Sequence, residues 1–182
     1  MTWTPVRPGD VLAVRTTGLA ARLIRFGEAL QGKPNLDNHV VLVHHDDPQG
    51  RWWGLEGRPG GVGWCDIRAY LDDRWTVNNC GQPLRGPEGR ARVCAAAVQM
   101  LGTPYDWEAI ADDTLRAFHM ADVWRSNWGG VAPGHVVCSS YTAFLYEREG
   151  WKRPDVGDRD AEPGDWSAFG IQNGYSAPLL GV

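Results

Sequence analysis

The most constraining stretch of the chain is the run NHVVLVHH at residues 38–45. Its four consecutive aliphatic residues, three of them valines, favour a strand. A strand that is apolar on both faces belongs in the interior of a sheet. The polar sequence DDPQG follows directly and is typical of a turn. We therefore expect a central strand that ends at the protein surface.

Short strands and turns dominate the first half of the chain, and helices dominate the second half. Further strands are expected at residues 9–15, 51–56, 61–67 and 74–78. Helices are expected at residues 17–31, 66–73, 88–101, 106–118 and 138–149. In the last of these, Tyr141, Phe144 and Leu145 are expected to face inward. This order predicts an α+β fold.

Length and charge limit the function classes. The chain has 182 residues and a net charge of −4, so it is long enough for one domain with a real core and lacks the basic balance of a nucleic-acid binder. Its longest aliphatic run has four residues, and the N-terminus MTWTPVRPGD has no apolar segment. We expect a single domain over residues 1–182, with a mostly irregular tail at 151–182. No nucleic-acid partner, integral membrane segment or signal peptide is expected, and the expected location is cytoplasmic or virion-associated.

The four cysteines are spread along the chain as Cys65, Cys80, Cys94 and Cys138, without the paired spacing of a structural zinc site. Without an export signal, disulfides are not expected. Cys138 differs from the others because it follows Val136–Val137 and opens the helical run CSSYTAFLYERE. The free N–H groups and the dipole of a helix N-terminus favour a thiolate, so Cys138 is the candidate nucleophile.

A thiol nucleophile needs a base, a group that orients the base, and donors for the oxyanion. The chain offers five histidines, namely His39, His44, His45, His119 and His135. His39 opens the apolar strand and is held by regular structure, whereas His44 and His45 end that strand beside a polar turn. We therefore favour His39 as the base, although a strand histidine on its own is more often structural.

Glu56 is the candidate orienting group, because it ends the next expected strand, in the sequence WWGLEGRPGG. An acid among apolar and aromatic residues is costly unless it is exposed or paired. Pairing with the His39 imidazole would explain it and would favour an imidazolium. The alternative is that Glu56 points outward at the strand end.

Three segments in this order resemble a known family: NHVVLVHH, then GLEGRPGGVGW, and finally GTPYDW followed by VVCSSYTAFLYE. Together with GDVLAV near the start, they are similar to the circularly permuted branch of the NlpC-type papain-like cysteine peptidase superfamily, in particular the YiiX-like proteins. In that branch the His precedes the Cys, as His39 precedes Cys138 here. The resemblance spans roughly residues 8–150.

The resemblance implies a permuted papain-like fold, which is an antiparallel sheet or a small barrel with helices packed on it. It implies Cys138 as nucleophile, His39 as base and Glu56 as the third, orienting residue. Tyr105 matches a tyrosine that relatives carry near the nucleophile, and Tyr105 and Ser139 are expected at the oxyanion hole or the substrate. The two serines after Cys138 replace the Ser-Glu of many relatives, which leaves the substrate preference open.

The expected activity is that of a thiol hydrolase, which cleaves an amide bond through a thioester without cofactor or metal. The resemblance allows a peptide, an isopeptide or a peptidoglycan stem peptide as substrate. A lipid ester or amide is the alternative, since Trp-rich loops could line an apolar cleft. A virion-associated protein of a phage would reach the cell wall without a signal peptide.

Two further classes compete with this hypothesis. A binding module with a vestigial site would use a recognition surface of tryptophans, namely Trp3, Trp52, Trp53, Trp124 and Trp128. A metal hydrolase built from His39, His44, His45 and Asp46 is disfavoured, because adjacent strand residues point to opposite faces. The sequence leaves the oligomeric state open.

Overall fold

The structure is a computed structural model in which residues 6–18, 21–22, 25–26, 37–71, 76–78, 84, 86–106, 137–150 and 178–179 are described. The described strands are β1 (Val11–Val14), β2 (His39–Asp46), β3 (Trp52–Arg58), β4 (Gly61–Asp66), β5 (Thr76–Asn78) and β6 (Pro178–Leu179). The described helices are α2 (Arg68–Leu71), α3 (Gly86–Gln99) and α5 (Cys138–Arg148). The α+β class is confirmed.

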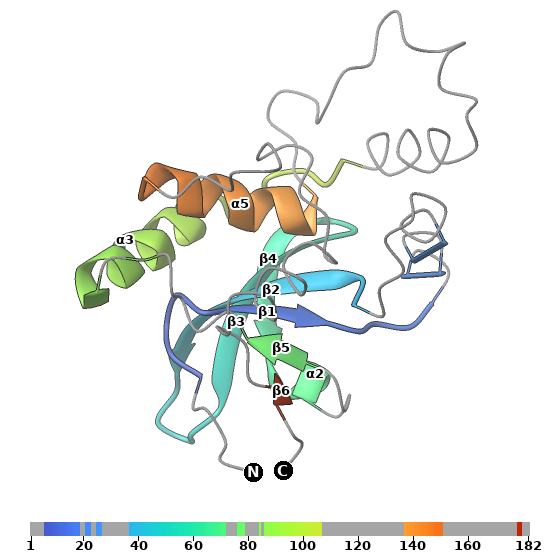
Figure 1. Ribbon diagram of the computed structural model, residues 1–182, viewed down its shortest axis with the longest axis horizontal. Coiled ribbons are helices and arrows are strands. Elements are labelled where there is room, and N and C mark those ends of the chain that lie inside the picture. Colours follow the sequence, from blue (N-terminus) through green and yellow to red (C-terminus); the bar gives the residue numbers. More distant parts are fainter. Residues whose placement is uncertain are drawn as a thin grey trace, which may run out of the picture.

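All described strands pair antiparallel in one sheet, in the order β4-β3-β2-β1-β5-β6. The first four strands form a meander in which each strand lies beside the next one along the chain (Figure 1). The predicted central position of residues 38–45 is confirmed, since β2 lies between β1 and β3. Among the described strands the sheet ends at β4 and β6, so it is an open antiparallel sheet.

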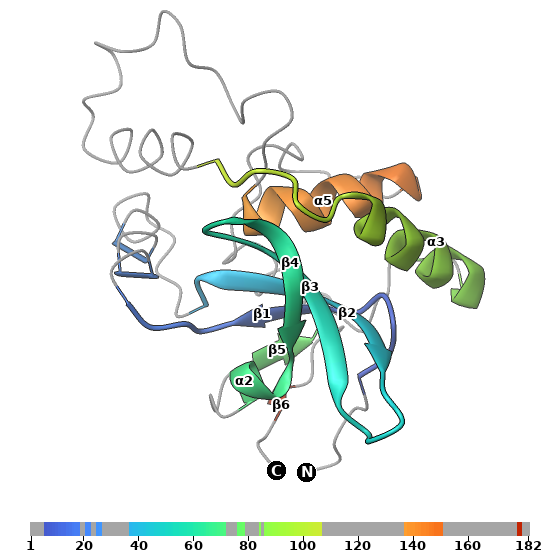
Figure 2. The ribbon, with the colours of Figure 1, turned by 180° about the vertical axis from the view of Figure 1, so that it is seen from behind.

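Alternation along the strands divides the core between the two faces of the sheet. Val11 and Ala13 of β1 belong to one buried cluster, whereas Leu12 and Val14 belong to another. The first cluster also contains Tyr141, Leu145 and Tyr146 of α5 and residues of α3, and the second contains Ile67 beside α2. Helices α3 and α5 lie next to each other on one side of the sheet (Figures 1 and 2).

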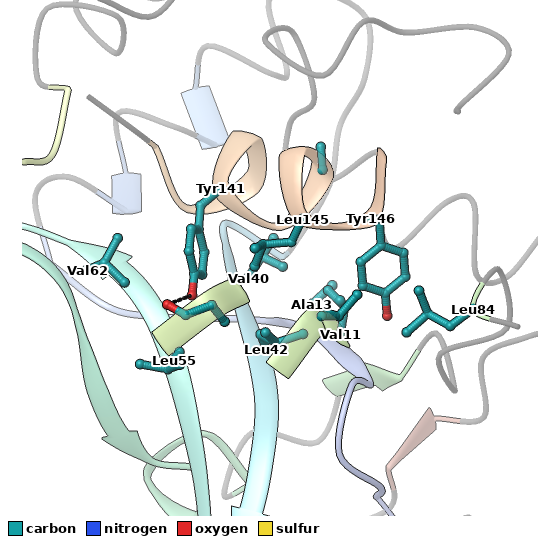
Figure 3. Close-up of a cluster of buried hydrophobic side chains, with 13 residues drawn as sticks. Val11, Ala13, Val40, Leu42, Leu55, Val62, Leu84, Tyr141, Leu145 and Tyr146 are labelled. Carbon is teal, nitrogen blue, oxygen red and sulfur yellow. Dashed lines mark hydrogen bonds between the residues drawn. The ribbon is translucent and has the colours of Figure 1, made fainter. Parts of the chain in front are cut away.

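Helix α5 packs on the sheet through its aromatic side chains, as Figure 3 shows. Tyr141 is fully buried and its hydroxyl donates to the carbonyl of Ala97 in α3 (3.3 Å). Tyr146 is fully buried as well, and its hydroxyl donates to the carbonyl of Gly9 (2.5 Å). These contacts fix the position of α5 on the sheet and thereby the place of the α5 N-terminus.

One part of the predicted inward face of α5 is wrong. Tyr141 and Leu145 are fully buried as expected, but Phe144 is 41% exposed. The buried face passes instead through Thr142 and Tyr146, which places Phe144 toward solvent. The Phe144 ring lies under the guanidinium of Arg148 at 5.8 Å.

Several predictions lie outside the described residues. They concern most of the helix at 17–31, the helix at 106–118 beyond Asp106, the tail at 151–182 apart from β6, and Cys80, His119 and His135. In the described ranges, no helix has the length and apolar character needed to cross a bilayer.

Candidate active site

The His39–Glu56 pair joins the start of β2 to the end of the adjacent strand β3. His39 Nε2 donates to Glu56 Oε2 at 2.6 Å. The His39 side chain is 12% exposed and that of Glu56 only 2%. The expected pairing is present, and the alternative of an outward-pointing Glu56 is wrong.

The buried carboxylate of Glu56 has two further partners. The Tyr70 hydroxyl, next to the end of α2, donates to Glu56 Oε2 at 2.5 Å, and Arg58 Nη1 donates to Oε1 at 3.3 Å. Burial by itself raises the pKa of Glu56, but the hydrogen bond and charge of His39, with help from Tyr70 and Arg58, lower it below its ordinary value. Glu56 is therefore an anion at neutral pH, held by partners on both oxygens.

Cys138 is the first residue of α5. The first intrahelical bond runs from the Tyr141 N–H to the Val137 carbonyl (2.9 Å), so the N–H groups of Cys138 and Ser139 precede it. Both residues are buried, each 2% exposed. Thr142 closes the first turn, since its hydroxyl donates to the Ser139 carbonyl at 2.9 Å. The thiol thus lies at a helix N-terminus, as predicted.

Gly57 brings the end of β3 against the start of α5. A Cβ atom at this position would lie 3.3 Å from both Cα and N of Cys138 and 3.4 Å from the carbonyl carbon of Val137. Such separations are tighter than normal carbon contacts, so a side chain here would push the helix away. The absence of a side chain at Gly57 lets Cys138 approach the strand that carries Glu56.

The His39 imidazole bridges Glu56 and the Cys138 sulfur. Nε2 faces Glu56, and the ring is near enough to the Cys138 side chain for that group to shift its pKa. Burial by itself lowers the pKa of His39. The charge and hydrogen bond of Cys138, followed by those of Glu56, outweigh burial and raise the pKa to about 10. Three side chains from β2, β3 and α5 therefore form one chain of contacts.

Tyr105 reaches the same place from the segment that follows α3. This segment runs beside β4, because the Gly102 N–H donates to the Val62 carbonyl and the Val62 N–H donates to the Thr103 carbonyl, both at 2.9 Å. The Tyr105 hydroxyl is near enough to the side chain and the backbone N–H of Cys138 for both to act on its pKa. Burial, followed by the negative charge of Cys138, raises the pKa of Tyr105, so its hydroxyl stays protonated.

A pocket of about 300 Å³ opens beside the imidazole. The hydroxyl groups of Thr16, Thr17 and Tyr70 and the amide of Asn38 contribute to its lining. His39, Glu56, Arg58 and Tyr105 line it as well. The side chains that meet around Cys138 thus face a cavity that could receive a small polar group.

The other two described cysteines lack such an environment. Cys65 and Cys94 are free and buried. Burial raises the pKa of the Cys65 thiol well above its ordinary value and that of Cys94 to about 11. Cys94 therefore behaves as the small core residue that the sequence predicts.

The prediction for His44 and His45 is wrong in its geometry. Their Nδ1 atoms lie 2.9 Å apart, and both rings pack edge-on against Trp64. The pairing of β2 with β3 shifts register between Val43 and His45, and this bulge breaks the alternation on which the prediction relied. In the described ranges, no three His, Cys, Asp or Glu side chains are grouped as metal ligands.

The tryptophans proposed for a recognition surface fall into two groups. Trp52 packs against the second core cluster, and the Trp53 indole N–H donates to Asp47 at 3.1 Å. Both are half-buried and serve the β2–β3 hairpin. Trp3, Trp124 and Trp128 lie outside the described residues.

Three contributors to the site were missed by sequence reasoning: Gly57, Arg58 and Tyr70. The strand expected over residues 51–56 stops short of Gly57 and Arg58, whereas β3 continues through Arg58. The alternation Glu56–Arg58 on one strand face could have indicated a paired acid and base. Tyr70 gave no signal, because only the packing of α2 brings it to Glu56.

The chain matches no protein-family model and no curated protein sequence.

Proposed function

We propose that the protein is a thiol hydrolase that cleaves an amide bond through a thioester, with Cys138 as nucleophile, His39 as acid and base, and Glu56 as the orienting acid. The observation that carries the proposal is that the buried His39–Glu56 pair lies beside the start of α5, where Gly57, next to Glu56 on β3, approaches the backbone of Cys138. Geometry and roles of this kind define a catalytic triad more firmly than sequence positions do.

The electrostatics of the contacts favour a thiolate–imidazolium pair. Glu56 remains ionised and accepts the His39 Nε2 proton, and a charged Cys138 together with Glu56 raises the pKa of His39 to about 10, so the two charges of the pair support each other. A positive imidazolium and a helix N-terminus both stabilise a thiolate. The charge arrangement therefore supports attack by Cys138 without an external base.

The reaction follows from these positions. The Cys138 thiolate attacks the amide carbonyl carbon, an S–C bond forms, and the negative charge moves to the carbonyl oxygen. His39 gives its proton to the leaving nitrogen as the C–N bond breaks and a thioester remains. Water then attacks the thioester while His39 takes its proton, which releases a carboxylic acid and restores the pair.

Two donors lie where the oxyanion would form: the Cys138 N–H and the Tyr105 hydroxyl, which stays protonated because its pKa is raised. Tyr105 also lines the pocket, so a substrate carbonyl that approaches the sulfur from the pocket passes the Tyr105 hydroxyl. Removing one oxyanion donor typically costs about 10²–10³ in rate. Tyr105 thus supplies the second donor of the oxyanion hole.

The order of the elements supports the resemblance to the circularly permuted NlpC-type papain-like superfamily. A histidine strand comes first, an acidic strand follows beside it, and the cysteine opens a helix late in the chain that packs on the same sheet. We propose that this sheet and helix form a permuted papain-like fold.

The test is site-selective alkylation by iodoacetamide at a sub-stoichiometric dose near neutral pH, with peptide mapping by mass spectrometry. We expect Cys138 to react ahead of Cys65, Cys80 and Cys94, and we expect His39→Ala to slow its alkylation roughly tenfold or more. The matched control is His45→Ala, an exposed histidine of the same strand, which should leave the rate unchanged. Equal labelling of all four thiols, or an unchanged rate in His39→Ala, refutes the activated pair.

A second measurement separates a hydrolase from a binding module with a vestigial site. p-Nitrophenyl acetate should acetylate Cys138 with release of p-nitrophenol, and water should then release acetate. Release of many equivalents, lost in Cys138→Ala, supports hydrolysis. Selective alkylation of Cys138 without any turnover would favour the binding module.

A further inference from the structure

The described lining of the pocket beside His39 mixes polar and apolar surface but has no large aliphatic side chain. None of its eleven residues is Val, Leu, Ile, Met, Phe or Trp, and its apolar members include Ala21, Pro59 and two tyrosine rings. A fatty acyl chain needs a continuous aliphatic wall, because its affinity comes from apolar burial. The described lining offers no such wall.

Among the charged side chains described in this lining, Arg58 is the one that is mainly exposed. Glu56 is 2% exposed and is bound by His39, Tyr70 and Arg58, so its negative charge is already neutralised. Arg58 is 51% exposed. In the described part of the chain, one of its N–H groups bonds to Glu56 at 3.3 Å and its remaining donors make no hydrogen bond. These donors are left for an anion.

The position of the guanidinium is set by the strands on both sides. Arg58 and Glu56 are two apart on β3 and share a face, and the guanidinium lies over Gly63 of β4, where a Cβ atom would lie 3.2 Å from Nη2. Arg58 bonds to one carboxylate oxygen of Glu56 and His39 to the other. Arg58 thus lies one carboxyl group away from the imidazole.

From this arrangement we infer that the substrate of the proposed hydrolase is an acidic peptide-like amide, and that Arg58 determines specificity by binding a substrate carboxylate close to the scissile bond. The inference rests on the proposed function of Cys138 and His39. A guanidinium suits this role because its planar donors match both oxygens of a carboxylate. The carboxylate belongs within about two residues of the scissile carbonyl, since an extended residue spans about 3.3–3.6 Å.

Three alkylating probes test the inference without a known substrate. All three carry the same bromoacetyl group and differ only in the group attached to it. They are N-bromoacetylglycine, which carries a carboxylate, N-bromoacetylglycinamide, which is neutral, and N-bromoacetylhexylamine, which is apolar. In each, the Cys138 sulfur displaces bromide and an S–C bond forms. The rate of Cys138 modification is measured for each probe on the full chain. We expect the carboxylate probe to react about tenfold faster than the neutral one, the low end for a charged hydrogen bond, because Arg58 is half-exposed.

The ratio of the two rates isolates Arg58 from the reactivity of the thiol. Arg58→Gln should abolish the preference for the carboxylate, and Arg58→Lys should keep part of it. Arg51→Gln is the matched control, because it removes an arginine of similar exposure (42%) at the opposite end of β3 and should leave the ratio unchanged.

The outcomes are distinguishable from those that test the proposed function. If no probe modifies Cys138 selectively, the proposed function fails. If the neutral probe does so but the carboxylate gives no advantage, or Arg58→Gln keeps the advantage, the role of Arg58 is refuted. If the hexyl probe is the fastest of the three, the site takes an apolar acyl group and the inference is overturned.

Discussion

Gly57→Ala tests the contact that places Cys138 beside His39. The added methyl would lie 3.3 Å from two backbone atoms of Cys138, whereas carbon atoms prefer about 3.5–4.0 Å. The start of α5 would have to shift by a few tenths of an ångström. We expect a loss of about 1 kcal/mol in the free energy of unfolding, the low end for overpacking, because the required shift is small.

The same shift moves the Cys138 sulfur relative to the His39 ring. A displacement of 1 Å can cost about 10²-fold in rate, so a few tenths should slow alkylation of Cys138 by iodoacetamide roughly threefold to tenfold. The rate is measured by peptide mapping and the stability by urea unfolding of the same samples. Both effects should appear in Gly57→Ala together.

Gly63→Ala is the matched control for Gly57→Ala. It adds the same methyl to the neighbouring strand β4, where it meets only the flexible end of Arg58, at 3.2 Å. This variant should keep the wild-type rate with neutral iodoacetamide. A wild-type rate and stability in Gly57→Ala, or an equal loss in both variants, would show that β3 and the start of α5 are not in contact.

The remaining predictions concern Glu56 and its partners. Glu56→Gln should lower the free energy of unfolding by on the order of 3 kcal/mol near pH 6, as expected when one partner of a buried ion pair is removed. The pKa of His39 is raised from 6.5 to about 10, so its stabilisation is complete below pH 6.5 and is lost toward pH 10. The pKa of Glu56 is lowered from 4.5, so its stabilisation is complete above that pH and is lost below it. The difference in free energy of unfolding between the wild type and Glu56→Gln should therefore be largest between pH 4.5 and 6.5 and should shrink on both sides of this range. A difference that does not change with pH contradicts the ion pair. Tyr70→Phe should lower the free energy of unfolding by about 1–2 kcal/mol, because a buried hydrogen bond to Glu56 is lost. It should also move the acid limb of the pH dependence of Cys138 alkylation to higher pH, because Glu56 loses a donor that lowers its pKa. A destabilised Tyr70→Phe with an unmoved acid limb would assign Tyr70 a structural role alone.

The elements that depend on local pattern could be predicted. The valine-rich run of β2 was predicted as a central strand, and the structure confirms it. The start of α5 at Cys138 was also predicted, because an apolar pair is followed by a helical run. Such patterns can be read from sequence because the period of apolar residues sets which backbone conformation buries them.

Details that depend on neighbouring elements were missed or wrong. The bulge after Val43 placed His44 and His45 on one side, which alternation alone does not foresee. Phe144 faces solvent because the buried face of α5 is set by the height and rotation at which it rests on the sheet. Both outcomes arise from packing between elements.

The chain by itself determined the chemistry that is present: an imidazole at the start of a buried strand, an acid at the end of the next, and a thiol at a helix N-terminus. The tertiary structure alone decided that these groups meet, that Gly57 leaves room for Cys138, and that Tyr70 and Arg58 share the Glu56 carboxylate. The physical reason is that strand and helix patterns are local, whereas contacts between residues far apart in the chain depend on how whole faces pack.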